Sequence, residues 1–342
     1  MLRLASIIIR QRVQRYSLYT LSYVYYGCHL RRFSIVAGGA IEAICNLSLY
    51  ERGGVMAIFE MIKYHGQTYP PYLPLRIEEI AAHFDVQKIS GSLDFSLYTE
   101  YSYGKRNLDS ALIDRFPAIK MANKDRVPQL WKNEDWASQF AEFIVELVGS
   151  KTHLRIIEIH PPFSDYTDLK AFAKNYAIFE RIIKTHFSKV EILIENRCGS
   201  VYHGGKFILS RTEDIFKLAE LVKTEGLGLK MAYDVPQIYT AHKAKTEKQF
   251  IRLLEEAKNV RWFIGGVHLW GKRISESGRK VAHCGDLNSY FGDSATKDSF
   301  LRAFKDCFDD GIARKMVLEV NSSNDDLASI VNDLQSAGIQ FI

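Results

Sequence analysis

Acidic and imidazole side chains end five apolar segments in the second half of the chain. The segments read RIIEIH, EILIE, LKMAYD, FIGGVH and KMVLE, and their last residues are His160, Glu195, Asp234, His268 and Glu319. A carboxylate or imidazole at the end of such a segment is poorly solvated, and buried charges persist only when they are paired or bind a metal ion. Carboxylate and imidazole ligands suit Mn²⁺, Mg²⁺, Zn²⁺ or Co²⁺. The pattern therefore predicts a divalent-metal or catalytic site.

The spacing of these residues indicates how the chain would bring them together. They are 35, 39, 34 and 51 positions apart, about one strand-helix unit each. From about residue 43, short apolar runs alternate with segments of helical period, which favours a parallel sheet. We predict eight strands, at 43–48, 93–99, 116–121, 154–160, 190–195, 227–234, 262–269 and 315–320. The long gap between the first two is predicted to hold a helix at 77–84.

Eight such units indicate an α/β fold of the (β/α)8 TIM-barrel type with a basic N-terminal extension. Segment 136–148 illustrates the helices, because its apolar residues recur at the i, i+4, i+7 spacing of a helix packed on a sheet. An open doubly wound sheet would be expected to carry a glycine-rich phosphate loop, and the sequence has no such motif. In a barrel the carboxyl ends of the strands meet at one rim, so the five strand-end residues are expected to converge.

The positive charge lies outside the predicted barrel. Residues 1–41 contain six Arg and no acid, so the remaining chain holds 39 basic and 40 acidic residues although the whole carries +5. We predict a basic arm at 1–42 and one barrel domain at 43–342. The arm has the composition of an organellar transit peptide, of a surface-binding tail, or of an incorrectly assigned start.

The remaining composition narrows the class of protein. With 47% hydrophobic and 25% charged residues, the chain is neither mainly disordered nor collagen-like. Five scattered cysteines without a CxxC pair indicate a reducing compartment, so we expect a cytoplasmic protein unless the arm directs it to an organelle. The apolar runs of the arm are shorter than the roughly 20 residues of a membrane span, so no membrane partner is expected.

Ordered motifs resemble one known superfamily over about residues 154–322. They are LIEN at 193–196, the strand-ending Asp234, GVHLWG at 266–271, a His-x-Gly at 283–285 and LEV at 318–320. This order is similar to that of the xylose isomerase-like TIM-barrel superfamily, which contains sugar and sugar-phosphate isomerases and epimerases and the endonuclease IV group of AP endonucleases.

The resemblance implies roles for the strand-end residues. Glu195, Asp234, His268 and Glu319 correspond to the metal ligands of the superfamily. In its epimerase branch the two glutamates also act as the acid/base pair on opposite faces of the substrate. Substrate contacts are predicted for His160, Arg197, Trp270, Lys272, His283 and Asp286. Arg197 and Lys272 are candidate partners of a phosphate group, and a small sugar or sugar phosphate is the expected substrate.

The endonuclease branch is the alternative, and it is the one reading that predicts a nucleic-acid partner. His160-Pro161 resembles its fourth-strand His-Pro motif. However, Gln237 stands three residues after Asp234 where that branch has a His, and Val281 replaces the Asp of its Asp-x-His motif. A three-metal cluster would therefore lack ligands. A barrel that has lost catalysis and serves as a binding subunit is a third alternative, and a homo-oligomer remains open.

Overall fold

The computed structural model describes residues 18–22, 32–36, 56–64, 66–81, 94–99, 110–124, 129–150 and 153–342. The chain divides into two compact units, Met1–Val55 and Met56–Ile342. In the first unit the described residues form two strands, β1 (Leu18–Ser22) and β2 (Arg32–Val36), which pair antiparallel. The predicted boundary between an arm and the barrel at 42/43 lies outside the described residues and stays a prediction.

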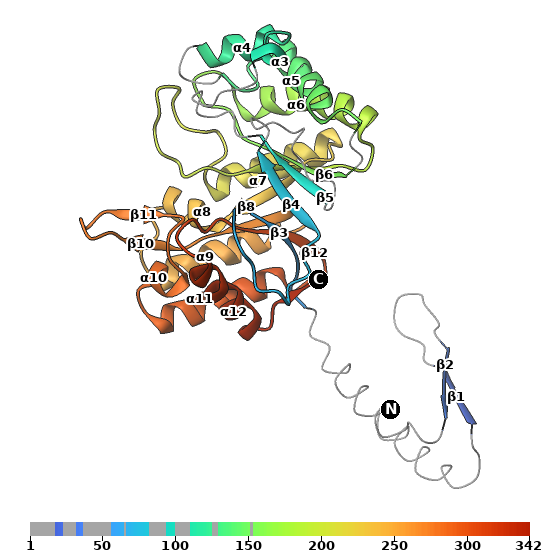
Figure 1. Cartoon of the computed structure of the whole chain (residues 1–342), viewed down its shortest axis with the longest axis vertical. Helices are drawn as coiled ribbons and strands as arrows, with labels where there is room; N and C mark the ends of the chain where they lie inside the picture. Colours follow the sequence, from blue (N-terminus) through green and yellow to red (C-terminus); the bar gives the residue numbers. More distant parts are fainter. Residues whose placement is uncertain are drawn as a thin grey trace. The chain divides into compact units, whose positions relative to one another are not determined.

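Parallel strands of the second unit form a closed barrel (Figure 1). They are β3 (Ile58–Lys63), β4 (Ile77–Ala81), β5 (Asp94–Tyr98), β6 (Leu154–Ile159), β7 (Glu191–Glu195), β8 (Lys230–Asp234), β9 (Ile264–Leu269) and β12 (Ala313–Leu318). Each strand pairs with the next in this order, and β12 pairs with β3, which closes the barrel. The short β13 (Gln340–Phe341) pairs with the start of β3. The predicted (β/α)8 TIM barrel is confirmed.

Amphipathic helices surround the barrel. The described helices are α3 (Ser110–Ile113), α4 (Pro117–Lys124), α5 (Glu134–Val148), α6 (Leu169–His186), α7 (Thr212–Glu225), α8 (Val235–Ala241), α9 (Glu247–Lys258), α10 (Leu287–Phe291), α11 (Ser294–Phe308) and α12 (Asn324–Ser336). A hairpin of β10 (Lys272–Ile274) and β11 (Lys280–Ala282) follows β9 and projects from the barrel (Figure 1). Within the described residues, no helix has the length and hydrophobicity needed to cross a membrane.

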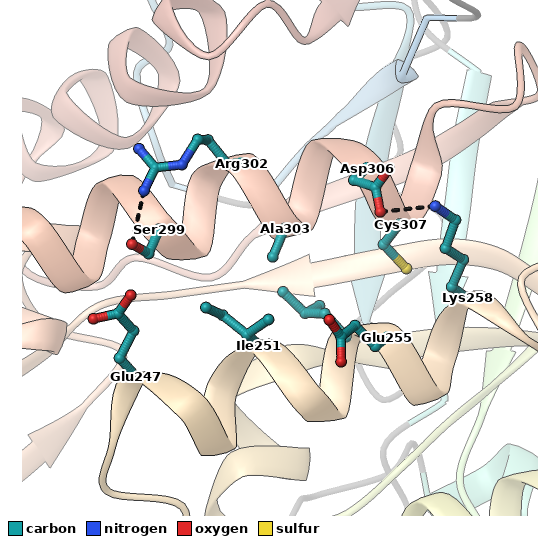
Figure 2. Close-up of a pocket in the computed structure, with 10 residues that line it drawn as sticks. Glu247, Ile251, Glu255, Lys258, Ser299, Arg302, Ala303, Asp306 and Cys307 are labelled. Atoms are coloured by element: carbon teal, nitrogen blue, oxygen red, sulfur yellow. Dashed lines mark hydrogen bonds and ion pairs between the residues drawn. The ribbon is translucent and has the colours of Figure 1, made fainter.

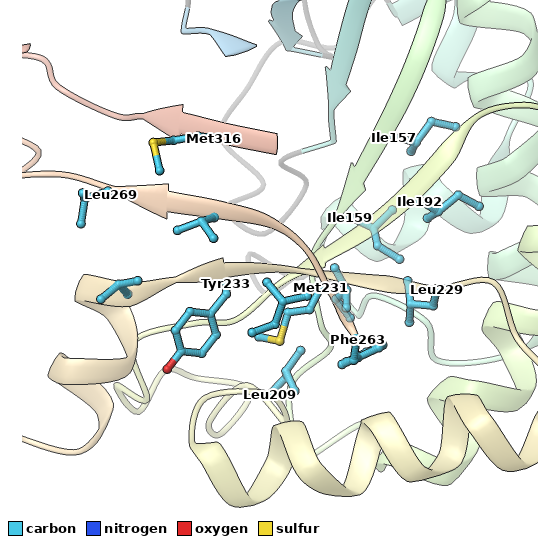
Figure 3. Close-up of a cluster of buried hydrophobic side chains, with 14 of the residues drawn as sticks. Ile157, Ile159, Ile192, Leu209, Leu229, Met231, Tyr233, Phe263, Leu269 and Met316 are labelled. Atoms are coloured by element: carbon cyan, nitrogen blue, oxygen red, sulfur yellow. The ribbon is translucent and has the colours of Figure 1, made fainter. Parts of the chain in front are cut away.

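Successive side chains of each strand point alternately toward the surrounding helices and into the interior of the barrel. Outward-facing residues such as Ile157, Ile192 and Met231 pack in the large core between the strands and the helices (Figure 3). A smaller interior cluster consists of Ile62, Ile77, Ile156, Leu193, Ala232 and Val317. Successive residues of a strand point to opposite faces, so the residue two positions after an inward-facing one also points inward. This rule directs the acidic residues at the ends of β6, β7, β8 and β12 into the barrel above an apolar floor.

The last five predicted strands are confirmed as β6, β7, β8, β9 and β12, and the predicted strand at 93–99 is β5, the third strand of the barrel. The predicted strand at 43–48 lies outside the described residues. The predicted strand at 116–121 is wrong, because residues 117–124 form α4. Pro117 is the first residue of this helix, a position that tolerates proline because its N–H would have no helical partner.

The predicted helix at 77–84 is also wrong, because residues 77–81 form β4. Ile77, Ile80, Ala81 and Phe84 have helical spacing in the sequence. In the structure the buried positions alternate instead, and they include Glu79, which is 3% exposed. A charged residue at an inward position hides the period-two pattern of a strand, since that pattern is recognised from apolar residues.

Candidate functional site

The four predicted ligands lie together at the carboxyl ends of their strands. Glu195, Asp234, His268 and Glu319 are all buried, with exposed fractions of 7% or less. One potential ligand atom each of Asp234, His268 and Glu319 lies within 4.8 Å of the other two. A second group with the same spacing consists of Glu158, Glu195 and His268. The barrel thus concentrates carboxylates around one imidazole, as the spacing along the sequence predicts.

The imidazole of His268 lies between two carboxylates. Its Nδ1 is 3.0 Å from Oε1 of Glu319, and its Nε2 is 3.0 Å from Oε2 of Glu158. Burial by itself would lower the pKa of His268, but the two carboxylates outweigh it and raise this pKa well above its ordinary value. Sequence reasoning missed Glu158. Its signal was its position two residues after the inward-facing Ile156 on β6.

Glu195 at the end of β7 accepts three donors. His160 Nε2 lies 2.8 Å and Arg197 Nη1 lies 3.0 Å from Oε2, and Gln237 Nε2 lies 2.5 Å from Oε1. Burial raises the pKa of the Glu195 carboxyl, but the charge of Arg197 and the hydrogen bond with His160 outweigh burial and hold this pKa below its ordinary value. Glu195 is therefore ionised at neutral pH. His160 and Arg197, both predicted substrate-binding residues, contact it directly.

Asp234 at the end of β8 differs from Glu195, because its surroundings raise the pKa of its carboxyl instead of lowering it. Its Oδ1 accepts the backbone N–H of Gln237 at 2.9 Å, which caps α8, and its Oδ2 accepts the Gln237 amide at 2.8 Å and the Trp270 Nε1–H at 3.0 Å. Burial, followed by the charges of Glu195 and Glu319, raises the pKa of Asp234 to about 7. A cation beside Asp234 would reverse this effect because it stabilises the ionised carboxylate.

Glu319 and His283 form the more exposed side of the cluster. Nδ1 of His283 is 3.1 Å from Oε2 of Glu319, and the side chain of His283 is 33% exposed. The rings of His283 and Trp270 lie 4.4 Å apart and are tilted by 30°. Burial raises the pKa of Glu319, but its contacts with His268 and His283 outweigh burial and hold this pKa well below the ordinary value. His283 has a φ of 57°, an uncommon backbone conformation for a residue with a side chain.

The donor set fits one divalent ion. A carboxylate offers about four lone-pair directions. Glu195 and Asp234 each already accept three N–H donors, which leaves roughly one direction each, whereas Glu319 contacts two imidazoles. Oε1 of Glu158 is buried and has no hydrogen-bond partner among the described residues. Oxygen and imidazole donors of this kind suit Mn²⁺, Mg²⁺, Co²⁺ or Zn²⁺.

Two other predicted substrate-binding residues lie outside this network. Lys272 is half-buried at the start of the β10–β11 hairpin, where burial and then the charge of Lys280 lower its pKa. Asp286 caps α10: it accepts the Ser289 N–H at 2.9 Å and also bonds to Asn288 and Ser329. No described hydrogen bond or ion pair joins Lys272 or Asp286 to the carboxylate cluster. A substrate contact of either residue therefore stays a prediction.

Three surface hollows of the described barrel share no residue with the cluster. Figure 2 shows one of them, which lies between α9 and α11. Lys258 forms an ion pair of 2.7 Å with Asp306 at its edge, and Cys307 lines it. Burial raises the pKa of the Cys307 thiol to about 12, so this thiol is a poor nucleophile at neutral pH.

Neither a family model nor a curated protein sequence matches the chain. Solved structures with similar architecture include an AP endonuclease of family 2 from Brucella melitensis, at 12% identity and a TM-score of 0.44 over 80% of this chain and 99% of that one. Another is a sugar phosphate isomerase/epimerase from Parabacteroides distasonis, at 10% identity and a TM-score of 0.37 over 77% and 82%. A fern chitinase catalytic domain gives 10% identity and a TM-score of 0.43 over 83% and 100%. These proteins differ in chemistry, so the likeness concerns architecture alone.

Proposed function

We propose that the protein is a divalent-metal-dependent enzyme that isomerises or epimerises a sugar or a sugar phosphate. The observation that carries this proposal is the group of Asp234, His268 and Glu319, whose buried ligand atoms lie within 4.8 Å of one another. Glu158 and Glu195 add two more buried carboxylates. Arg197 is the permanently charged cation that contacts this cluster within the described structure. A bound divalent ion would supply the missing positive charge, since buried charges require compensation.

Glu195, Asp234, His268 and Glu319 are the residues that would hold the ion. When bound there, a divalent cation would polarise the carbonyl and the neighbouring hydroxyl of a keto sugar, which lowers the cost of removing the proton between them. The ligand carboxylates lie on different sides of the rim, because β8 and β9 separate β7 from β12 in the sheet order. Glu195 and Glu319 could therefore approach a substrate from two faces.

Acid/base catalysis needs a carboxylate that is ionised and correctly oriented. The donors from His160, Arg197 and Gln237 keep the Glu195 carboxylate ionised and fix its orientation. Glu319 contacts His268 by a hydrogen bond of 3.0 Å and His283 by an ion-pair distance of 3.1 Å. One carboxylate would take the proton from the substrate carbon, and the other would return one to the opposite face in an epimerisation. The half-exposed ring of His283, tilted by 30° against the buried ring of Trp270, would contact the C–H face of a sugar.

The main alternative is an endonuclease IV-like phosphodiesterase, and Gln237 is the residue that disfavours it. Its amide bridges Glu195 and Asp234 with bonds of 2.5 and 2.8 Å. A neutral amide that donates to two carboxylates occupies the space where a cluster of several ions would need a further ligand. In addition, residues 42–342 are nearly neutral, whereas nucleic-acid binding draws much of its free energy from basic residues that contact phosphates.

Solvent deuterium exchange tests this proposal. The protein is incubated in D2O with Mn²⁺, Mg²⁺, Zn²⁺ or Co²⁺ and a panel of keto sugars and their phosphates. We expect metal-dependent incorporation of deuterium at the carbon beside the carbonyl of at least one sugar, with loss of the exchange in EDTA. A parallel assay uses an abasic-site duplex. Cleavage of the duplex without exchange in any sugar would establish the phosphodiesterase alternative instead, and inactivity in both assays would favour a non-catalytic barrel.

A further inference from the structure

The hydrogen bond between Glu158 and His268 crosses the interior of the barrel. Glu158 lies on β6 and His268 on β9, and β7 and β8 separate these strands in the sheet. Glu158 is 2% exposed, and its Oε1 has no hydrogen-bond partner among the described residues. A buried carboxylate with one unpartnered oxygen is costly, so its contact with a residue 110 positions away calls for a physical reason.

The two nitrogens of His268 face two different carboxylates. Nδ1 faces Glu319, which forms one group of close ligand atoms with Asp234 and His268, and Nε2 faces Glu158. A neutral imidazole has one bare nitrogen, which can bind a metal ion, and one N–H, which needs an acceptor. The assignment of these two nitrogens therefore decides where an ion binds.

Access to solvent distinguishes the two sides. The side chain of Glu319 is 9% exposed and that of its neighbour His283 is 33% exposed, whereas the side chain of Glu158 is 2% exposed. A catalytic ion must keep a position open to substrate. The Nδ1 side meets this condition, and the Nε2 side lies deeper in the barrel.

We propose that Glu158 is a positioning residue for His268, an inference that rests on the metal site of the proposed function. Glu158 accepts the Nε2–H of His268, so that the bare Nδ1 binds the ion together with Glu319 and Asp234. A carboxylate acceptor on the second nitrogen fixes the tautomer and the ring orientation of a metal-binding histidine and increases its basicity. Glu158 performs this role from the closed side of the cluster and without contact to a substrate.

Zinc binding and NMR spectroscopy of the zinc-loaded protein test this role. Long-range ¹H–¹⁵N spectra of protein with labelled histidine identify which ring nitrogen of His268 binds zinc, and competition with a chelator gives the affinity. In the parent we expect zinc on Nδ1 and a proton on Nε2. Glu158→Gln keeps an acceptor oxygen and should weaken zinc binding about tenfold, while Glu158→Leu has no acceptor and should weaken it about 100-fold.

Glu180→Gln is the matched control, because Glu180 is a half-buried carboxylate of α6 whose described hydrogen bonds accept the Gly228 N–H, at 2.8 and 3.1 Å. It should leave the tautomer and the zinc affinity of the parent unchanged. Zinc on Nε2, or parent-like affinity in both Glu158 variants, would overturn the role of Glu158 while the metal site stands. If the parent binds no zinc, the metal site fails and the inference fails with it. Circular dichroism identifies a misfolded Glu158→Leu variant, in which case the smaller effect in Glu158→Gln decides.

Discussion

Replacement of Glu319 by Gln is expected to lower the turnover of the sugar substrate by about 1,000-fold or more. The amide has the same shape as the carboxylate but lacks its charge, so the variant loses both a ligand of the proposed ion and one of the two proposed acid/base groups. A general acid or base alone contributes typically 10²–10⁴-fold. The measurement is kcat for the sugar identified by deuterium exchange, at saturating metal concentration.

Glu142→Gln provides the control for this variant. Glu142 is an exposed carboxylate of α5, so its amide variant should retain the kcat of the parent. A fall of less than tenfold in Glu319→Gln, with metal bound at the parent level, would show that Glu319 is neither an essential ligand nor an acid/base group.

The largest effect on stability is expected for Trp131→Ala, at about 3–5 kcal/mol of unfolding free energy. Trp131 is 1% exposed, and its ring lies 5.0–5.7 Å from the rings of Trp136, Phe140, Phe172 and Phe179. Its Nε1–H also donates to the carbonyl oxygen of His160 at 2.8 Å, so this core supports the carboxyl end of β6. Removal of the ring would leave a large cavity next to the backbone of His160.

Urea unfolding of the parent and of Trp131→Ala measures this difference in unfolding free energy. Trp262→Ala is the matched control, because Trp262 is 42% exposed and its loss should cost no more than about 1 kcal/mol. Equal losses in the two variants would contradict the assignment of Trp131 to the centre of the core.

The later strands of the barrel were predictable because their sequences are simple. A parallel strand that is buried on both faces reads as a nearly continuous apolar run, as in β7 and β9. The early strands β3 and β4 place Glu60 and Glu79 within the strand, and Glu60 forms an ion pair with Lys315 of the neighbouring β12. Such a partner 255 positions away leaves no local signal in β3. In β4 the inward-facing Glu79 interrupts the apolar alternation, so the sequence pattern resembled a helix.

The candidate site was predictable to the same extent. Four candidate ligands followed from their position after apolar runs, and the barrel brings them into two groups that share His268. Glu158 and the bridging role of Gln237 did not follow, because their function depends on contacts with residues 110 and 42 positions away. Asp286 was assigned to substrate from its place in a loop near His283; it caps α10 and accepts the hydroxyl of Ser329, and its contact with a substrate stays a prediction.

Metal analysis of the purified protein tests the central claim most directly. Protein stripped with a chelator and reloaded with Mn²⁺, Co²⁺ or Zn²⁺ should bind one ion per chain. Asp234→Asn should abolish this binding, and Asp298→Asn, which alters an exposed carboxylate of α11, should preserve it. Absence of a bound ion in the parent, or equal binding by Asp234→Asn, would contradict a divalent-metal site at the carboxyl ends of the strands.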